Sequence, residues 1–208
     1  MHIHRLLRSS LCLVLLTGLA GTSLGCKPKA VRGGPGTENP KLDEGAMGTG
    51  LDRVDIQYLV DENLQAMFAS PFWGRDVQSA PQAPIVAIWP IKNATDQHLD
   101  DQMLTLLSEI ETQMINSGAV NVVSRERQAE MFEEVKLQNT DIYNPATAAQ
   151  LGAQLGAKYY ITGKITSNDE RFDKERRVQY SLFLQVIEVE TSMIKFQHTS
   201  ERSKAIVR

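Results

Sequence analysis

The stretch Pro84-Ile-Val-Ala-Ile-Trp-Pro-Ile-Lys-Asn-Ala-Thr95 decides the fold class of this chain. Its apolar run, 85–89, stands between two prolines without a polar interruption, which is typical of a strand buried on both faces. Asn93-Ala94-Thr95 then predicts a polar turn, in which the Asn and Thr side chains bond the nearby backbone. A buried strand that leads through a turn into a long amphipathic segment indicates an α/β domain.

Helices are predicted on both sides of this strand, because apolar residues recur there at helical spacing. The first is capped by Asp52 and is followed by Phe72-Trp73, which we expect to pack back onto the domain. The last begins at Asn144-Pro145, a capping residue followed by proline at the first helical position. The predicted helices span 52–68, 100–117, 125–137 and 144–155.

The remaining apolar segments read as strands. A short one is expected over 119–123, and three more close the chain at 158–166, 177–188 and 193–199. The 177–188 segment alternates between apolar and polar residues, so one of its faces is predicted to be buried. These elements predict an α/β fold in one small, three-layer-like domain over 51–208. It has a mixed sheet that ends in antiparallel strands, with helices packed on the sheet.

The N-terminus has the features of an export signal. Basic residues precede an apolar run over residues 11–16, and small residues follow up to Cys26, so 1–25 is predicted to be a signal peptide. Ser23-Leu24-Gly25-Cys26 resembles a bacterial lipobox, which implies lipidation of the Cys26 thiol, and an ordinary secretory signal is the alternative. Lys27 follows where an inner-membrane retention signal would place Asp, which favours the outer membrane.

Residues 26–50 read as a lipidated cysteine followed by a disordered tether. The stretch is rich in Gly and Pro and has no aromatic residue, so it cannot bury enough apolar surface to offset its ordering entropy. It reaches about 80 Å when fully extended. The acyl chains are the expected membrane contact, and no other membrane contact is expected.

Composition and motifs exclude several functions. The chain carries 22 basic and 25 acidic residues, a net charge of −3, so it is not expected to bind nucleic acid. No nucleophile elbow, phosphate loop or metal-ligand spacing occurs, and we therefore expect no catalytic residues, no metal, no cofactor and no small-molecule substrate. The protein is predicted not to be an enzyme.

Basic residues crowd one turn between two of the predicted strands. They are Arg171, Lys174, Arg176 and Arg177. A solvated hairpin tip is one interpretation, and a docking edge for an acidic partner is the other. With Asn93 and Thr95 of the polar turn, these residues are the predicted partner-binding set.

The order of segments is similar to that of the LpoB family. The resemblance rests on the 84–95 stretch, on Asn121-Val-Val-Ser-Arg125 and on Leu155-Gly-Ala-Lys-Tyr-Tyr-Ile-Thr-Gly163, and covers roughly 51–200. In looser form these segments also resemble CsgG-like lipoproteins and the N-terminal domain of TolB. The resemblance implies an outer-membrane lipoprotein without enzymatic activity that activates a class A (bifunctional) penicillin-binding protein in peptidoglycan synthesis.

Two other classes stay open at this point. One is a CsgG-like lipoprotein subunit of an outer-membrane secretion assembly, which would run as a large ring after detergent extraction. The other is a periplasmic enzyme or small-ligand binder, for which the sequence offers no site.

Overall fold

The computed structural model describes residues 30–137, 144–172 and 174–206. The predicted signal peptide and Cys26 lie outside the described residues. The helical elements are α1 (Arg53–Phe68), the π-helical segment η1 (Trp73–Gln78), α2 (Asp100–Asn116), α3 (Arg125–Leu137) and α4 (Pro145–Gln154). The strands are β1 (Ile85–Ile88), β2 (Lys92–Asn93), β3 (Asn121–Val122), β4 (Tyr159–Phe172), β5 (Glu175–Glu188) and β6 (Ile194–Ile206).

The described strands form one six-stranded mixed sheet in the order β3-β1-β4-β5-β6, and β2 also pairs with β4. The β1–β3, β1–β4 and β2–β4 pairs are parallel, whereas the β4–β5 and β5–β6 pairs are antiparallel. Parallel pairs need crossover connections, and the helices supply them. This arrangement confirms the predicted α/β class and the antiparallel end of the sheet.

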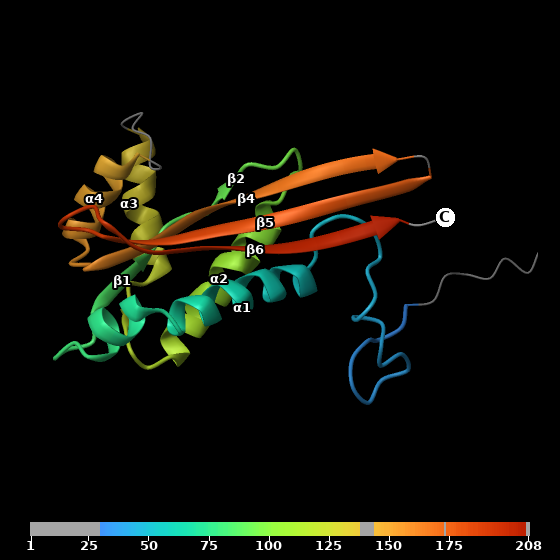
Figure 1. Cartoon of the computed structure of the whole chain (residues 1–208), viewed down its shortest axis with the longest axis horizontal. Coiled ribbons are helices and arrows are strands. Elements are labelled where there is room, and N and C mark those ends of the chain that lie inside the picture. The colour runs from blue at the N-terminus through green and yellow to red at the C-terminus, as the bar shows by residue number, and fades with distance from the viewer. Residues whose placement is uncertain (1–29, 138–143, 173, 207–208) are drawn as a thin grey trace, which may run out of the picture.

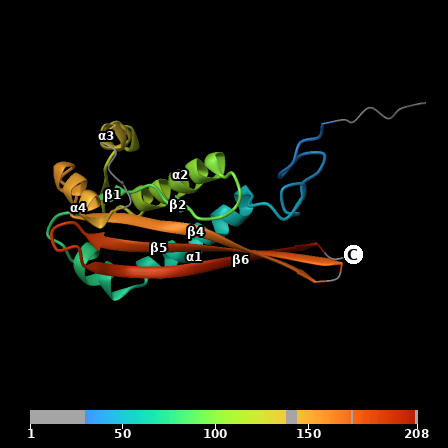
Figure 2. The same ribbon diagram turned by 90° about the horizontal axis from the view of Figure 1, so that it is seen from above.

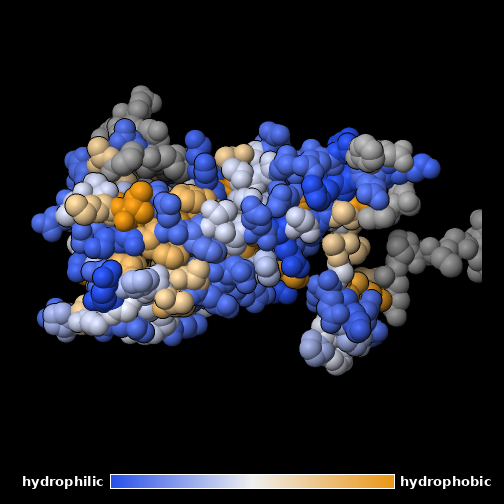
Figure 3. Space-filling model, in the orientation of Figure 1, coloured by the Kyte–Doolittle hydropathy of each residue, from blue (hydrophilic) through white to orange (hydrophobic). Residues whose placement is uncertain are grey.

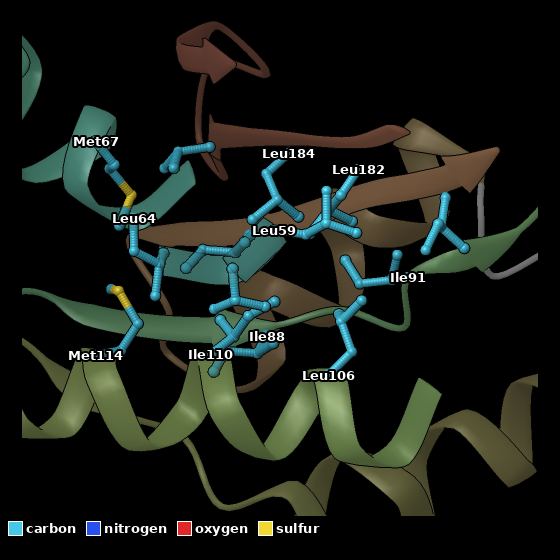
Figure 4. Close-up of a cluster of buried hydrophobic side chains, with 14 of the residues drawn as sticks. Leu59, Leu64, Met67, Ile88, Ile91, Leu106, Ile110, Met114, Leu182 and Leu184 are labelled. Carbon is cyan, nitrogen blue, oxygen red and sulfur yellow. The ribbon is translucent and has the colours of Figure 1, made fainter. Parts of the chain in front are cut away.

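One face of the sheet packs against α1 and α2. Apolar side chains from α1, α2 and β5 point toward one another there (Figure 4), among them Leu59, Leu64, Ile110, Met114, Leu182 and Leu184. Each fully buried side chain of this size contributes roughly 1.5–3 kcal/mol to folding. The alternation predicted for 177–188 is confirmed, because the alternate residues from Val178 to Val186 are buried.

The other face packs against α3 and α4 over a smaller area. Trp89, Phe132 and Tyr160 form its centre, and the Trp89 ring lies edge-on to the Phe132 ring with centroids 4.8 Å apart. Figures 1 and 2 show α3 and α4 together at one end of the molecule. The far ends of β4, β5 and β6 extend toward the opposite end, where the segment that precedes α1 lies. The helices thus form outer layers on both faces, as predicted.

The predicted helix boundaries are confirmed to within a residue or two. Asp52 accepts from the backbone N–H groups of Val54 and Asp55, while the Asp55 carboxylate accepts from the Asp52 N–H, which completes a capping box. Asn144 caps α4 through the N–H of Ala146. Gly118 and Gly156 follow α2 and α4 with φ of 66° and 68°, the left-handed conformation that ends helices.

Two strands are longer than predicted. β4 continues from the predicted end at 166 to Phe172, and β6 continues from 199 to Ile206. Their added residues pair with β5 in continuous antiparallel register, so backbone hydrogen bonds extend the sheet beyond its apolar core. The short strand β2 and the segment η1 were not predicted. Among the described residues, no helix combines the length and apolar character needed to cross a membrane.

Candidate partner-binding site

The turn at Asn93–Gln97 is held by its own side chains. Asn93 Oδ1 accepts from the backbone N–H of Thr95 at 3.0 Å and from its hydroxyl at 2.8 Å. Asn93 Nδ2 donates to the carbonyl of Gln97 at 2.8 Å. The predicted polar turn is therefore confirmed. Both side chains are therefore engaged inside the turn and fix its shape.

Tyr180 of β5 fixes this turn to the sheet. Gln97 Nε2 donates to the Tyr180 hydroxyl at 2.7 Å, and that hydroxyl donates to the carbonyl of Thr49 at 3.0 Å. Tyr180 is fully buried, and Thr49 is also buried. Thr49, near the end of the predicted tether, thus packs against the domain.

The arginines of the β4–β5 hairpin lie opposite carboxylates of the same hairpin. Arg176 donates to both carboxylate oxygens of Asp169, from Nε at 3.0 Å to Oδ1 and 3.2 Å to Oδ2, and from Nη2 at 2.6 Å to Oδ2. Arg177 pairs with Glu170. The hydrogen bond from Arg176 holds the pKa of Asp169 below its ordinary value, and the one from Arg177 does the same for Glu170. The basic turn is therefore largely neutralised by its own strand.

Two basic residues of the hairpin tip remain more open. The Arg171 side chain is 71% exposed and reaches Asp169 only at 3.7 Å. Lys174 is exposed at the turn itself. Any attraction of an acidic partner to this tip would start from these two residues, because the charge of Arg176 and Arg177 is already compensated.

The structure does not bring the predicted residues into one cluster. Asn93 pairs with Ile165 of β4, and Arg171 lies farther along the same strand. At ~3.3 Å per residue the two groups are about 20 Å apart. A partner that contacts both would have to follow β4 over that length.

Sequence reasoning missed a hollow of about 350 Å³ between α4 and the sheet. Cross-strand pairs of β4 and β5 line it, because directly opposed residues share a sheet face. The pairs are Tyr160–Ile187, Thr162–Gln185 and Lys164–Phe183. Trp89, Lys92 and Ala148 complete its walls. The alternation along 177–188 was the one sequence signal for it, because it places Phe183 on the face of the strand opposite the predicted core.

The described residues contain no group of three or more His, Cys, Asp or Glu side chains that could hold a metal ion. Burial raises the pKa of the Tyr160 phenol, which keeps it neutral at ordinary pH. The hollow combines apolar surface with the ammonium groups of Lys92 and Lys164.

These features define an α/β domain with a side-chain-braced turn, a long antiparallel hairpin and a hollow beside α4. The chain belongs to the LpoB family, since the family profile described as peptidoglycan-synthase activator LpoB matches residues 55–201. No curated protein sequence matches the chain.

Solved structures of LpoB are among those similar to the chain. The LpoB C-terminal domain from Escherichia coli is 12% identical, with a TM-score of 0.48, over 72% of this chain and 99% of that one. The corresponding domain from Salmonella enterica is 15% identical, with a TM-score of 0.44, over 71% and 94%. Lipoprotein GNA1162 from Neisseria meningitidis is 9% identical, with a TM-score of 0.43, over 59% and 83%.

Proposed function

We propose that the protein is a non-enzymatic outer-membrane lipoprotein that binds and activates a class A penicillin-binding protein, and so regulates peptidoglycan synthesis. The observation that carries this proposal is the match of residues 55–201 to a family described as peptidoglycan-synthase activators. The side chains around the turn, the hairpin and the hollow support it, because they offer contact surface rather than a reaction centre.

The chain is divided into three parts in this proposal. Residues 1–25 direct export, Cys26 with 27–50 forms a lipidated tether, and 51–208 form the activating domain. Cys26→Ala should release the protein from membranes, since two acyl chains are what makes such an anchor stable. Membrane fractionation after a salt wash tests this step. A Cys26→Ala variant that stays in the membrane fraction would contradict the lipid anchor.

Activation by binding requires only that the domain prefer the active conformation of the synthase. The difference in affinity between the two conformations then sets the largest possible activation. The proposed contacts are the turn at Asn93 and Thr95 and the basic hairpin with Arg171, Lys174, Arg176 and Arg177. Within the hairpin, Arg171 and Lys174 are the more open basic residues. Charges at the rim of an interface act mainly on the rate of association.

A binding experiment with purified components tests the proposal. The detergent-extracted chain is immobilised, and a bifunctional synthase from the same cells is passed over it. Saturable binding is expected, while a monofunctional transpeptidase from the same cells should not bind. Absence of binding to every class A synthase of those cells would contradict the proposed function.

A further inference from the structure

Thr49 and Gly50 form the root of the predicted tether, where the chain enters the domain. We propose that this root is a releasable strap, and that its displacement is transmitted through the Tyr180 hydroxyl to the Asn93–Gln97 turn. The inference goes beyond the proposed function, because it assigns a conformational device to the fold and requires no particular partner.

The root is buried, although the segment before it is not. Of residues 30–50, all of which the structure describes, Thr49 alone is buried, at 8% exposure. Met47, two residues earlier, is 92% exposed. Figure 3 shows the segment before α1 as a largely hydrophilic lobe beside the end of the sheet that carries the β4–β5 hairpin. A pull on the tether would therefore act first on the contacts of Thr49 and Gly50.

One proton serves two acceptors at the first of these contacts. The Tyr180 hydroxyl oxygen lies 3.0 Å from the carbonyl oxygen of Thr49 and 3.0 Å from Gln97 Oε1. A phenol has a single O–H donor, so it bonds one of these oxygens at a time. While Thr49 is seated, the hydroxyl donates to its carbonyl and accepts from Gln97 Nε2 at 2.7 Å. When Thr49 leaves, the same proton turns to Gln97 Oε1.

Release of the root therefore leaves no buried donor of these contacts unpaired. Tyr180 is fully buried, and an unsatisfied hydroxyl there would oppose any opening. The second contact has the same property. Lys204 Nζ donates to the carbonyl of Gly50 at 2.8 Å. When Gly50 leaves, the ammonium keeps the carboxylates of Asp52 and Asp55, and the freed carbonyls of the root bond water.

Leu51 limits the opening to the root. Its side chain is 4% exposed and belongs to the core cluster beside α1. Asp52 follows as the cap of α1. Unseating these two residues would expose apolar surface and break the capping box, which costs more than the exchange of one hydrogen bond. The strap thus comprises Thr49 and Gly50, and the domain stays folded in both states.

Gln97 carries the change into the turn. Its carbonyl accepts from Asn93 Nδ2 at 2.8 Å, and its backbone N–H donates to Thr95 Oγ1 at 3.2 Å. The Gln97 side chain is held by one hydrogen bond while Thr49 is seated, and by two when the hydroxyl turns to Oε1. Release of the root therefore tightens the turn. Because such coupling is reciprocal, a partner that fixes Gln97 also favours release of the root.

Hydrogen exchange of two backbone N–H groups measures this coupling. The N–H groups of Thr95 and Gln97 close the turn, and NMR of the full chain in detergent resolves their exchange rates. Thr49→Glu should displace the root, because a longer charged side chain does not fit the buried position. Exchange of both groups should then slow about fivefold, the effect expected of one net hydrogen bond. Met47→Glu adds the same charge at an exposed position and should leave both rates unchanged.

Two variants remove the link and leave the strap in place. Tyr180→Phe keeps the buried ring and loses the shared hydroxyl, while Gln97→Met loses the side-chain amide at a half-buried position in the turn. In either background Thr49→Glu should no longer slow exchange at Thr95, because one member of the coupled pair is gone. Gln97→Met lies outside the core, so it decides the question even where Tyr180→Phe does not fold.

The position of the root is read from the NMR cross-peak between residue 49 and the Tyr180 ring. A cross-peak that persists in Thr49→Glu would contradict a releasable root. Equal exchange rates in Thr49→Glu and Met47→Glu, or a slowing that persists in the Gln97→Met background, would overturn the coupling. These measurements use no synthase, so their failure and the failure of the proposed function are separate results.

Discussion

Lys204, near the end of β6, places its ammonium nitrogen 2.5 Å from Oδ2 of Asp55 in the first turn of α1. The Lys204 side chain is 8% exposed and that of Asp55 is 2% exposed. The same nitrogen contacts Asp52 Oδ2 at 2.5 Å and donates to the carbonyl of Gly50 at 2.8 Å. One buried cation therefore joins the last strand, the helix cap and the end of the tether.

Removing this cation should destabilise the domain. Lys204→Met leaves the buried Asp55 carboxylate without its closest cation, since Arg202 Nε is 3.6 Å away. Loss of one partner of a buried pair costs about 3 kcal/mol of unfolding free energy. Urea denaturation checks this value. Lys164→Met, at an exposed position, is the control and should change stability by less than about 0.5 kcal/mol.

The cluster also predicts a pH dependence. Burial alone would raise the pKa of Asp52, but the hydrogen bonds from Lys204 and from backbone N–H groups outweigh it, and the pKa lies below its ordinary value. The stabilisation of the folded state by the Asp52 carboxylate is therefore fully present above the unfolded pKa of about 3.9. It is lost as the pH falls through the pKa of the folded state. Burial likewise opposes charge on Lys204, yet the two carboxylates raise its pKa.

The alkaline limb follows from the raised pKa of Lys204. The stabilisation of the folded state by the Lys204 ammonium is fully present below the unfolded pKa of about 10.4. It is lost as the pH rises through the pKa of the folded state. Urea unfolding of the wild type and of Lys204→Met at acidic and at alkaline pH measures the difference in unfolding free energy between the two proteins. The stability gap between them should narrow at each extreme. A gap that stays constant with pH would contradict the assigned ion cluster.

Gly163 of β4 is required by close approach of the neighbouring strand. A Cβ at this position would overlap the carbonyl oxygen of Phe183 and lie 2.9 Å from Leu184 Cδ2. Because the first of these atoms is backbone in the centre of the sheet, Gly163→Ala should cost about 3 kcal/mol or prevent folding. Thermal unfolding tests this, with Gly74→Ala as control, since nothing lies within 4 Å of a Cβ at Gly74. Equal melting temperatures would refute the steric argument.

Charge reversal in the hairpin tests whether the basic turn docks. In Arg176→Glu/Arg177→Glu, binding to the synthase should weaken and its salt dependence should decrease, because rim charges act through long-range attraction. The affinity is measured at low and high salt, with Arg53→Glu as control. An unchanged affinity would remove the hairpin from the interface and leave the activator function standing.

The core and the helices could be predicted from local patterns. Capping residues such as Asp52 and Asn144 act on their own neighbours, and apolar spacing within one helix marks its buried face. The same holds for β1, where prolines and an apolar run are adjacent in sequence. These features need no knowledge of distant parts of the chain.

The end of β4, the hairpin ion pairs and the hollow depend on how segments that are distant in the sequence pair with one another. Beyond residue 166, β4 is polar and has no apolar alternation, so only pairing with β5 keeps it extended. The ion pairs Arg176–Asp169 and Arg177–Glu170 follow from that pairing. Sequence alone presented the same arginines as a free basic turn. The hollow likewise needs α4, β2 and β5 placed together, which no local pattern specifies.

The central claim is that this chain activates a bifunctional synthase. The most direct measurement is the rate of glycan-strand polymerisation and peptide cross-linking by the purified synthase, with and without the detergent-extracted chain. The account predicts that the chain raises both rates in a saturable manner and converts no precursor when the synthase is left out. Unchanged rates at saturating concentrations of the chain, despite binding, would contradict it.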